Sequence, residues 1–194
     1  MGRGGAVLAA LVMAGSSGCV VRLQPVAREG WVVYGRSSPV VRPVSRPRPV
    51  TFAAFYSALA PDGEWTVLPP YGYVWRPHAS MVGPDFVPYS TGGRWEWTEA
   101  GWQFEAEYPW SWATFHYGRW LREPSMGWIW VPGTVWGPAW VEWRMMDGYV
   151  AWAPLGPAGI SVAVTAPGWS YVEAQYLGHP HLHRFVVTAP PRRK

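Results

Sequence analysis

Three histidines near the C-terminus have the clearest capacity for metal chemistry. His179, His181 and His183 alternate with Pro180 and Leu182, so an extended segment would project three imidazoles to one side. Three imidazoles are a suitable ligand set for Zn or Cu. The Pro and Leu residues disturb that geometry, and no acidic residue adjoins the histidines in sequence. The pattern therefore leaves two interpretations open, a metal site and an exposed histidine cluster.

Two carboxylates, Glu105 and Glu107, are the best candidates for catalysis. They are two residues apart on a predicted strand, so they point the same way and could flank a glycosidic bond, as in inverting glycosidases. Acids at this spacing are more typical of a solvated strand face. No Gly-rich phosphate loop leads from a strand into a helix, and the single cysteine is Cys19. We therefore expect no enzymatic activity and no cofactor.

Tryptophans beside Pro and Gly are candidates for binding a ligand. Trp110, Trp112, Trp136 and Trp140 lie in predicted loops, where flat rings could stack on the sugars of peptidoglycan or an exopolysaccharide. Fourteen Trp residues occur from Trp65 to Trp152, too many for one ligand groove. Because each indole buries a large area, we expect most of them to form the core.

A short motif built on Gly and Trp recurs through the centre of the chain. Each copy has a Gly followed two residues later by Trp, and then a second Gly with aromatic residues behind it. Three copies begin at Gly63, Gly93 and Gly118, and a degenerate fourth contains Trp143 and Trp152. The first three copies start thirty and then twenty-five residues apart, a period typical of small supersecondary units.

Each copy predicts a β-hairpin. In the second copy Trp95 and Trp97 share one face of the first strand, and Trp102 and Phe104 share one face of the second. The turn between them ends at Gly101, which is free to take a positive φ. Four hairpins give about eight strands. We therefore predict an all-β fold with one short N-terminal helix, an antiparallel meander of hairpins that forms a small barrel, a twisted sheet or a sandwich.

Two arginines precede Trp residues at equivalent places in the motif. By strand parity Arg94 and Arg119 face away from those Trp residues. Each could pair with a Glu on the neighbouring strand or stack on an exposed ring.

The segments beside the repeats predict one helix and further strands. Thr51 to Leu59 has apolar residues at helical spacing behind a Thr cap, so we expect a helix that covers one end or face of the β-structure with its aromatic residues in the core. Ile160, Val162 and Val164 alternate as in a strand, and Trp169 with Tyr171 predict another.

The charge distribution disfavours nucleic-acid binding. The formal net charge is +4, but the stretch 53–191 contains six Arg and no Lys against eleven acidic residues. The positive surplus lies in the residues before and after that stretch. The predicted domain therefore lacks the basic face that nucleic-acid binding requires.

The N-terminus predicts export. Arg3 precedes the apolar run Ala6 to Ala14, which is too short to span a bilayer, and residues 1–18 are expected to be a signal peptide. The Ser-Gly-Cys sequence that ends at Cys19 resembles a bacterial lipoprotein signal, in which the chain is cut before the Cys and the Cys is acylated. Val20 would then imply sorting to the outer membrane. Ordinary secretion and a cytoplasmic protein remain as alternatives.

The rest of the chain divides into three parts. Residues 19–50 form an Arg/Pro-rich linker behind the lipidated Cys, because its Pro residues break helices and strands. The linker is expected to be a solvated spacer, with its Arg residues available to anionic headgroups or wall polymers. Residues 51–188 are expected to form the Trp-rich β domain, and residues 189–194 are expected to be a disordered basic tail.

Several motifs together resemble a Trp-rich bacterial envelope family catalogued as a domain of unknown function. They are Gly93-Arg94-Trp95, His116-Tyr117-Gly118-Arg119-Trp120, Gly127-Trp128-Ile129-Trp130-Val131-Pro132-Gly133, Trp136-Gly137-Pro138-Ala139-Trp140-Val141-Glu142-Trp143-Arg144 and Trp152-Ala153-Pro154-Leu155. The resemblance covers about residues 52 to 188. It implies the fold and export, and it supplies no catalytic residue.

These observations favour a non-enzymatic, exported cell-envelope lipoprotein of the outer membrane, a structural or binding module held at the membrane by its N-terminal lipid. The expected ligand is peptidoglycan or a polysaccharide bound by exposed aromatic rings. The alternative is an assembly module that binds another envelope protein through an exposed Trp patch. Metal binding by the three histidines is the third class.

Overall fold

The computed structural model of the 194-residue chain describes residues 49–157 and 168–189. The helices are α1 (Phe52–Leu59), α2 (Ala79–Val82) and α3 (Ser111–Thr114), with 3-10 helices η1 (Ala60–Asp62), η3 (Ala174–Tyr176) and η4 (Leu182–Arg184). The strands are β1 (Gly63–Leu68), β2 (Gly72–Pro77), β3 (Gly93–Thr98), β4 (Gly101–Ala106), β5 (Arg119–Glu123), β6 (Gly127–Val131), β7 (Val141–Met146), β8 (Tyr149–Pro154) and β9 (Ser170–Glu173). The predicted mainly β fold with one short N-terminal helix is confirmed.

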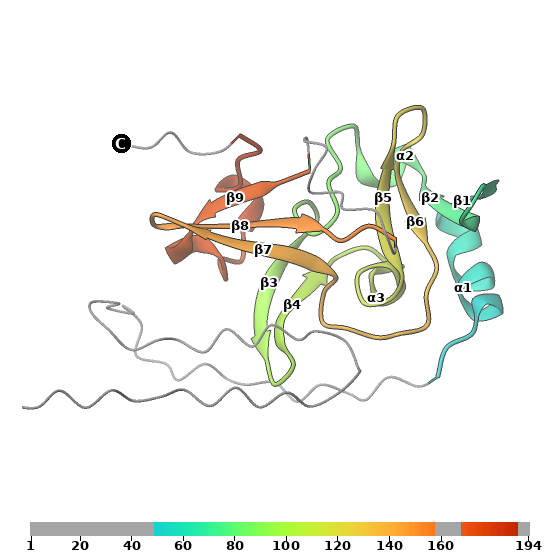
Figure 1. The fold of residues 1–194 in the computed structure, drawn as a ribbon, viewed down its shortest axis with the longest axis horizontal. Coiled ribbons are helices and arrows are strands. Elements are labelled where there is room, and N and C mark those ends of the chain that lie inside the picture. The colour runs from blue at the N-terminus through green and yellow to red at the C-terminus, as the bar shows by residue number, and fades with distance from the viewer. Residues whose placement is uncertain (1–48, 158–167, 190–194) are drawn as a thin grey trace, which may run out of the picture. The chain divides into compact units, whose positions relative to one another are not determined.

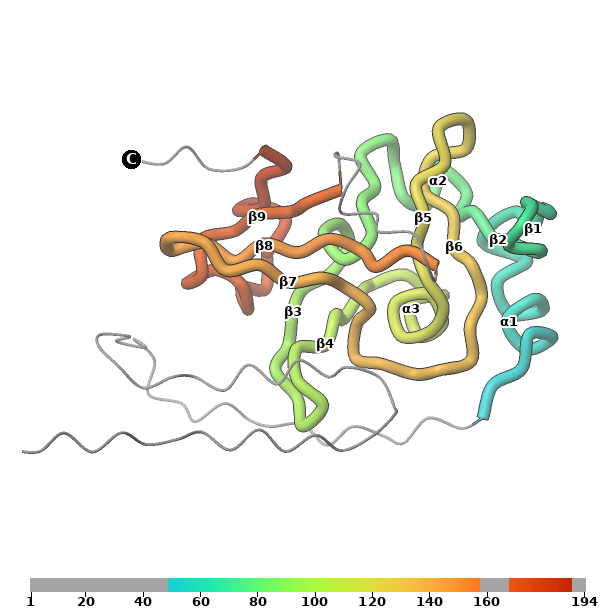
Figure 2. Tube along the Cα trace, in the orientation of Figure 1, coloured from blue at the N-terminus to red at the C-terminus, as the bar shows by residue number. Residues whose placement is uncertain are grey.

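The described strands form three antiparallel sheets (Figure 1). Their orders are β1-β2-β6-β5, β3-β4 and β7-β8-β9. All four predicted hairpins are present, as β1–β2, β3–β4, β5–β6 and β7–β8. The trace in Figure 2 shows β7, β8 and β9 side by side, as their pairing requires.

The four hairpins do not continue as one sheet, because β2 pairs with β6 rather than with β3. Trp75 of β2 lies opposite Trp130 of β6. The β2–β3 connection contains α2 together with Pro84 and Pro88, which have no N–H to donate to a strand ladder. The chain therefore leaves the first sheet after β2, and the described sheets do not close into a barrel.

The four hairpins share one register, in which two aromatic rings face each other across the ladder. The pairs are Trp65 with Trp75, Trp95 with Phe104, Trp120 with Trp130, and Trp143 with Trp152. The second ring of every pair is completely buried. Each hairpin therefore contributes its large ring to the interior, as the alternation predicts.

The Gly of the motif makes room for that buried ring. A Cβ placed on Gly63 would lie 2.5 Å from the Trp75 ring, and one on Gly93 would lie 2.7 Å from Phe104. Gly118 stands in the same relation to Trp130, also at 2.7 Å. The spacing of Gly and Trp thus reflects packing within each hairpin.

Most of the tryptophans from Trp65 to Trp152 pack in the core, as expected. Seven of the fourteen are buried, namely Trp75, Trp95, Trp110, Trp120, Trp128, Trp130 and Trp152. Trp65, Trp102, Trp136, Trp140 and Trp143 are partly buried and pack against this core. Several indole N–H groups donate to backbone carbonyls of distant segments, including Trp75 to Leu59 at 3.0 Å, Trp120 to Thr114 at 2.9 Å and Trp130 to Tyr117 at 2.8 Å. These bonds fix the rings and satisfy carbonyls outside the strand ladders.

Helix α1 covers the first sheet as predicted. The Thr51 side chain caps it by accepting the Ala54 N–H at 3.3 Å. Phe55 and Leu59 are completely buried, but Phe52 and Tyr56 are 40% and 44% exposed. The expectation that all its aromatic residues are core is therefore wrong, because the helix packs on one side only.

Some sequence expectations lie outside the described residues. These are the signal peptide 1–18, the linker from Cys19 to residue 48, the strand at Ile160 to Val164 and the tail from residue 190. The strand expected near Trp169 and Tyr171 is β9. None of the described helices is both long and apolar enough to cross a bilayer.

Candidate functional site

The four tryptophans expected to bind a ligand do not form one surface. Trp110 is buried and stacks on Tyr108, with ring centroids 4.5 Å apart. Trp112 is 42% exposed and stacks on Phe55 of α1 at 5.8 Å. Among the four, Trp112 therefore offers the most accessible ring.

Trp136 and Trp140 belong to a polar arrangement that fixes the β6–β7 loop. The Trp140 indole donates to the His116 carbonyl at 3.0 Å, and the Arg119 guanidinium lies 3.5 Å from the Trp140 ring centroid. Trp136 stacks on the His116 ring at 5.9 Å. The expected stacking of Arg119 on a ring is confirmed, and it covers one face of Trp140.

His116 is held neutral within this arrangement. Burial lowers its pKa below the ordinary 6.5. Its Nδ1 lies 3.2 Å from the Gly137 carbonyl, an acceptor, so Nδ1 carries the proton. The imidazole therefore serves to hold the loop in place.

A larger aromatic surface lies on α1 and the β1–β2 hairpin. We define the aromatic platform as Phe52, Tyr56, Trp65 and Tyr73. Phe52 lies 5.5 Å from Trp65 and 5.6 Å from Tyr73, and Tyr56 stacks on Trp65 at 5.2 Å. Tyr73 is 50% exposed, and Trp65 is half-buried. The platform is thus a contiguous patch of accessible rings, which sequence reasoning missed because it assigned the helix aromatics to the core.

The three C-terminal histidines lie in sequence order around η4. The ring centroids of His179 and His181 are 5.9 Å apart, and those of His181 and His183 are 6.2 Å apart. The segment forms turns rather than the extended backbone expected, and His179 Nδ1 accepts the His181 backbone N–H at 3.0 Å. In the part of the chain that the structure describes, no three His, Cys, Asp or Glu residues are placed to hold a metal ion.

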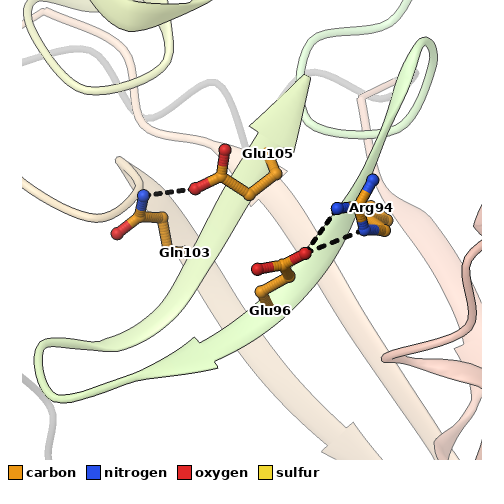
Figure 3. A network of polar contacts seen from close by, with 4 residues as sticks. All are labelled: Arg94, Glu96, Gln103 and Glu105. Carbon is orange, nitrogen blue, oxygen red and sulfur yellow. Dashed lines mark hydrogen bonds and ion pairs between the residues drawn. The ribbon is translucent and has the colours of Figure 1, made fainter. Parts of the chain in front are cut away.

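The carboxylates considered for catalysis lie on and beyond β4. Glu105 accepts a hydrogen bond from Gln103 Nε2 at 2.5 Å (Figure 3). On β3, Arg94 pairs with Glu96 of its own strand at 2.5 Å rather than with a neighbouring strand. Glu107 is exposed. Gln103 and Arg94 thus hold two carboxylates in a polar network on one side of the hairpin.

A cleft of about 690 Å³ lies between the β1–β2 hairpin, the α2 region and the β5–β6 hairpin. Its apolar lining includes Phe86, Trp128 and Trp169, each of which is buried except for a small exposed part. Asp85 and Arg122 are charged residues of the lining. Sequence reasoning missed these residues because no spacing connects them.

Comparison with known proteins places the chain in a family. A family model described as a family of unknown function (DUF6600) matches residues 56–159, more than half of the chain. The chain belongs to the DUF6600 family. No curated protein and no solved structure matches it.

The DUF6600 match begins within α1 and ends beyond β8. It therefore includes the four hairpins and their facing ring pairs. It is shorter than the expected resemblance over residues 52 to 188, and it excludes β9 and the three histidines. Tyr56, Trp65 and Tyr73 of the aromatic platform lie within the DUF6600 region, as do Asp85 and Arg122 of the cleft.

Proposed function

We propose that this DUF6600 protein is a non-enzymatic, exported module of the bacterial cell envelope that binds a wall polysaccharide on its aromatic platform. The observation that carries the proposal is the contiguous exposure of Phe52, Tyr56 and Tyr73 around Trp65. Exposed apolar patches of this kind are typical of interaction sites. Flat rings can pack against the apolar faces of sugar rings.

The platform is well suited to a long polymer rather than to an enclosed small molecule. Its rings come from two elements, α1 and the β1–β2 hairpin, and their mutual contacts are mainly tilted or edge-on. Val67, which is 60% exposed, extends the apolar surface along β1. A surface of this form can contact successive units of a chain without surrounding any of them.

In the proposed arrangement, the linker from the lipid anchor leads directly to the aromatic platform. Cys19 would be acylated at the outer membrane, and residues 19–50 would form the linker that ends just before Phe52. An extended polyproline-like chain rises about 3.1 Å per residue, so this linker reaches on the order of 90 Å. That length is sufficient for a membrane-held domain to reach a separate polymer layer.

Retention of the purified full-length chain on isolated peptidoglycan sacculi tests the proposed function. We expect the wild type to be retained and Phe52→Ala/Tyr73→Ala to lose about tenfold or more in affinity, because each ring contact contributes about 0.5–1.5 kcal/mol. Trp97→Ala is the matched control, since Trp97 is 44% exposed on β3 outside the platform. Thermal unfolding of each variant checks that it is folded.

Two results would count against polysaccharide binding. One is wild-type retention no greater than that of a Trp-poor control protein, and the other is equal retention of the platform variant. Specific capture of an envelope protein through the same rings, without retention on sacculi, would favour the assembly alternative. The metal content of the dialysed protein tests the third alternative, metal binding by His179, His181 and His183.

A further inference from the structure

The cleft beneath the β1–β2 hairpin lies on the opposite side of that hairpin from the aromatic platform. Successive residues of a strand point to opposite faces, so Glu64 faces away from Trp65, and Arg76 faces away from Trp75. Glu64 and Arg76 pair at 2.5 Å and both line the cleft. One hairpin therefore presents aromatic rings on one face and a polar cleft wall on the other.

The charges of the cleft balance. Two carboxylates, Glu64 and Asp85, and two guanidinium groups, Arg76 and Arg122, line the cleft. Glu64 and Arg76 neutralise each other, whereas the ion pairs found within residues 49–157 and 168–189 include neither Asp85 nor Arg122. The cleft thus contains one carboxylate and one guanidinium available to a ligand, without a net charge that would select an anion.

The floor of the cleft is aromatic and rigid. Phe86 packs edge-on against Trp120 at 5.5 Å and against Trp110 at 6.2 Å. Trp128 lies directly opposite Arg122 in the β5–β6 ladder, and the Arg144 guanidinium lies 4.1 Å from the Trp169 ring centroid. These contacts fix the rings in advance, which lowers the entropic cost of binding.

We propose that this cleft binds a short uncharged oligosaccharide segment. The inference rests on the proposed function for its ligand class, and it adds a second site that selects the sugar. Sugar hydroxyls both donate and accept hydrogen bonds, so they can donate to the Asp85 carboxylate and accept from the Arg122 guanidinium. The apolar face of the sugar contacts the aromatic floor. The volume of about 690 Å³ lies within the range of about 300–1,000 Å³ typical of small-ligand sites.

Titration of the full-length chain with the uncharged, fully N-acetylated chitin tetramer, followed by calorimetry, tests the cleft. Asp85→Asn/Arg122→Gln removes both charges; Asn has the size of Asp, and Gln is a shorter polar replacement for Arg. We expect this variant to lose about tenfold or more in affinity, because hydrogen bonds to charged groups are the stronger ones. Arg94→Gln/Glu96→Gln is the matched control, since it neutralises an ion pair of β3 that does not line the cleft. The control is expected to bind as the wild type does.

Three results would overturn the cleft proposal. They are an unchanged affinity of Asp85→Asn/Arg122→Gln, no binding of the tetramer by the wild type, and tighter binding of an anionic galacturonate oligomer than of the tetramer. The sacculus assay with the platform variant is independent of these results. Loss of retention there, together with an unaffected cleft variant, would leave the proposed function in place and remove only the cleft.

Discussion

At the scale of single residues, Tyr89 connects three distant segments of the chain. Its hydroxyl donates to the Phe115 carbonyl at 3.2 Å and accepts the Trp140 backbone N–H at 3.3 Å. Its own carbonyl accepts the Trp152 indole N–H at 2.9 Å. Burial raises the pKa of the hydroxyl well above its usual range, so the group stays protonated. Tyr89 has a φ of 64°, a strained value for a residue other than glycine that the surrounding contacts must hold.

Replacing Tyr89 by Phe removes only the hydroxyl. We expect Tyr89→Phe to lower the free energy of unfolding by about 1–3 kcal/mol, because the partly buried Trp140 N–H loses its acceptor and the Phe115 carbonyl loses its donor. Urea unfolding measures the loss. Tyr73→Phe is the control, since Tyr73 is half exposed, and it should change the stability by less than about 0.5 kcal/mol. Equal effects of the two substitutions would contradict the connecting role of Tyr89.

At the scale of the elements, the same packing arrangement recurs in the hairpins. In each of the first three hairpins a Gly leaves room for a ring on the partner strand, and that ring faces the Trp two residues after the Gly. The fourth hairpin has Val141 in place of the Gly but keeps the facing pair Trp143 and Trp152. The facing pair, rather than the Gly, is therefore the feature common to all four.

Substitution of two glycines with similar φ values distinguishes the cost of lost packing space from the cost of backbone strain. Gly118 and Gly148 have φ values of 62° and 74°, but a Cβ on Gly118 would overlap the Trp130 ring and the Val131 carbonyl, whereas one on Gly148 would meet nothing within 4 Å. We expect Gly118→Ala to cost about 2–5 kcal/mol and Gly148→Ala about 1–2 kcal/mol of unfolding free energy. Urea unfolding of the two variants measures these losses of unfolding free energy. Similar losses would mean that the ring does not need the space.

The hairpins could be predicted from the sequence, because alternation with a period of two and turn glycines are local signals. The arrangement of the sheets could not. The pairing of β2 with β6 at Trp75 and Trp130 depends on contacts between residues more than fifty positions apart, and no local pattern encodes it. Pro84 and Pro88 after β2 disfavour continuous pairing, but they do not indicate a new neighbour.

Only the kind of side chain at the candidate site could be predicted from the sequence, and its positions could not. Aromatic rings were expected to bind, and Trp112 is exposed, but Trp110 is buried although it lies beside Pro109. The spacing of apolar residues in α1 could not distinguish Phe55 from Tyr56, because a helix covered on one side exposes rings that adjoin its buried stripe. Asp85 and Arg122 come together only through the fold.

At the scale of the whole molecule, the proposed account separates attachment from recognition. The positive charge of the sequence lies outside the stretch 53–191, where eleven acidic residues outnumber six Arg. The Arg residues of the proposed linker would be available to anionic headgroups at its membrane end, whereas the more acidic domain would be repelled from them. The proposed linker, residues 19–50, would end just before Phe52, so the platform would lie at the attached end of the domain.

Hydroxyl-radical footprinting of the full-length chain, free and bound to sacculi, shows whether the polymer lies on the aromatic platform. It measures which side chains become protected when the polymer is present. We expect protection of Phe52, Tyr56 and Tyr73, with Trp97 and Met145 as reactive as in the free chain, because these two are exposed outside the platform. Protection of Trp97 or Met145 with the platform rings left reactive would contradict this expectation.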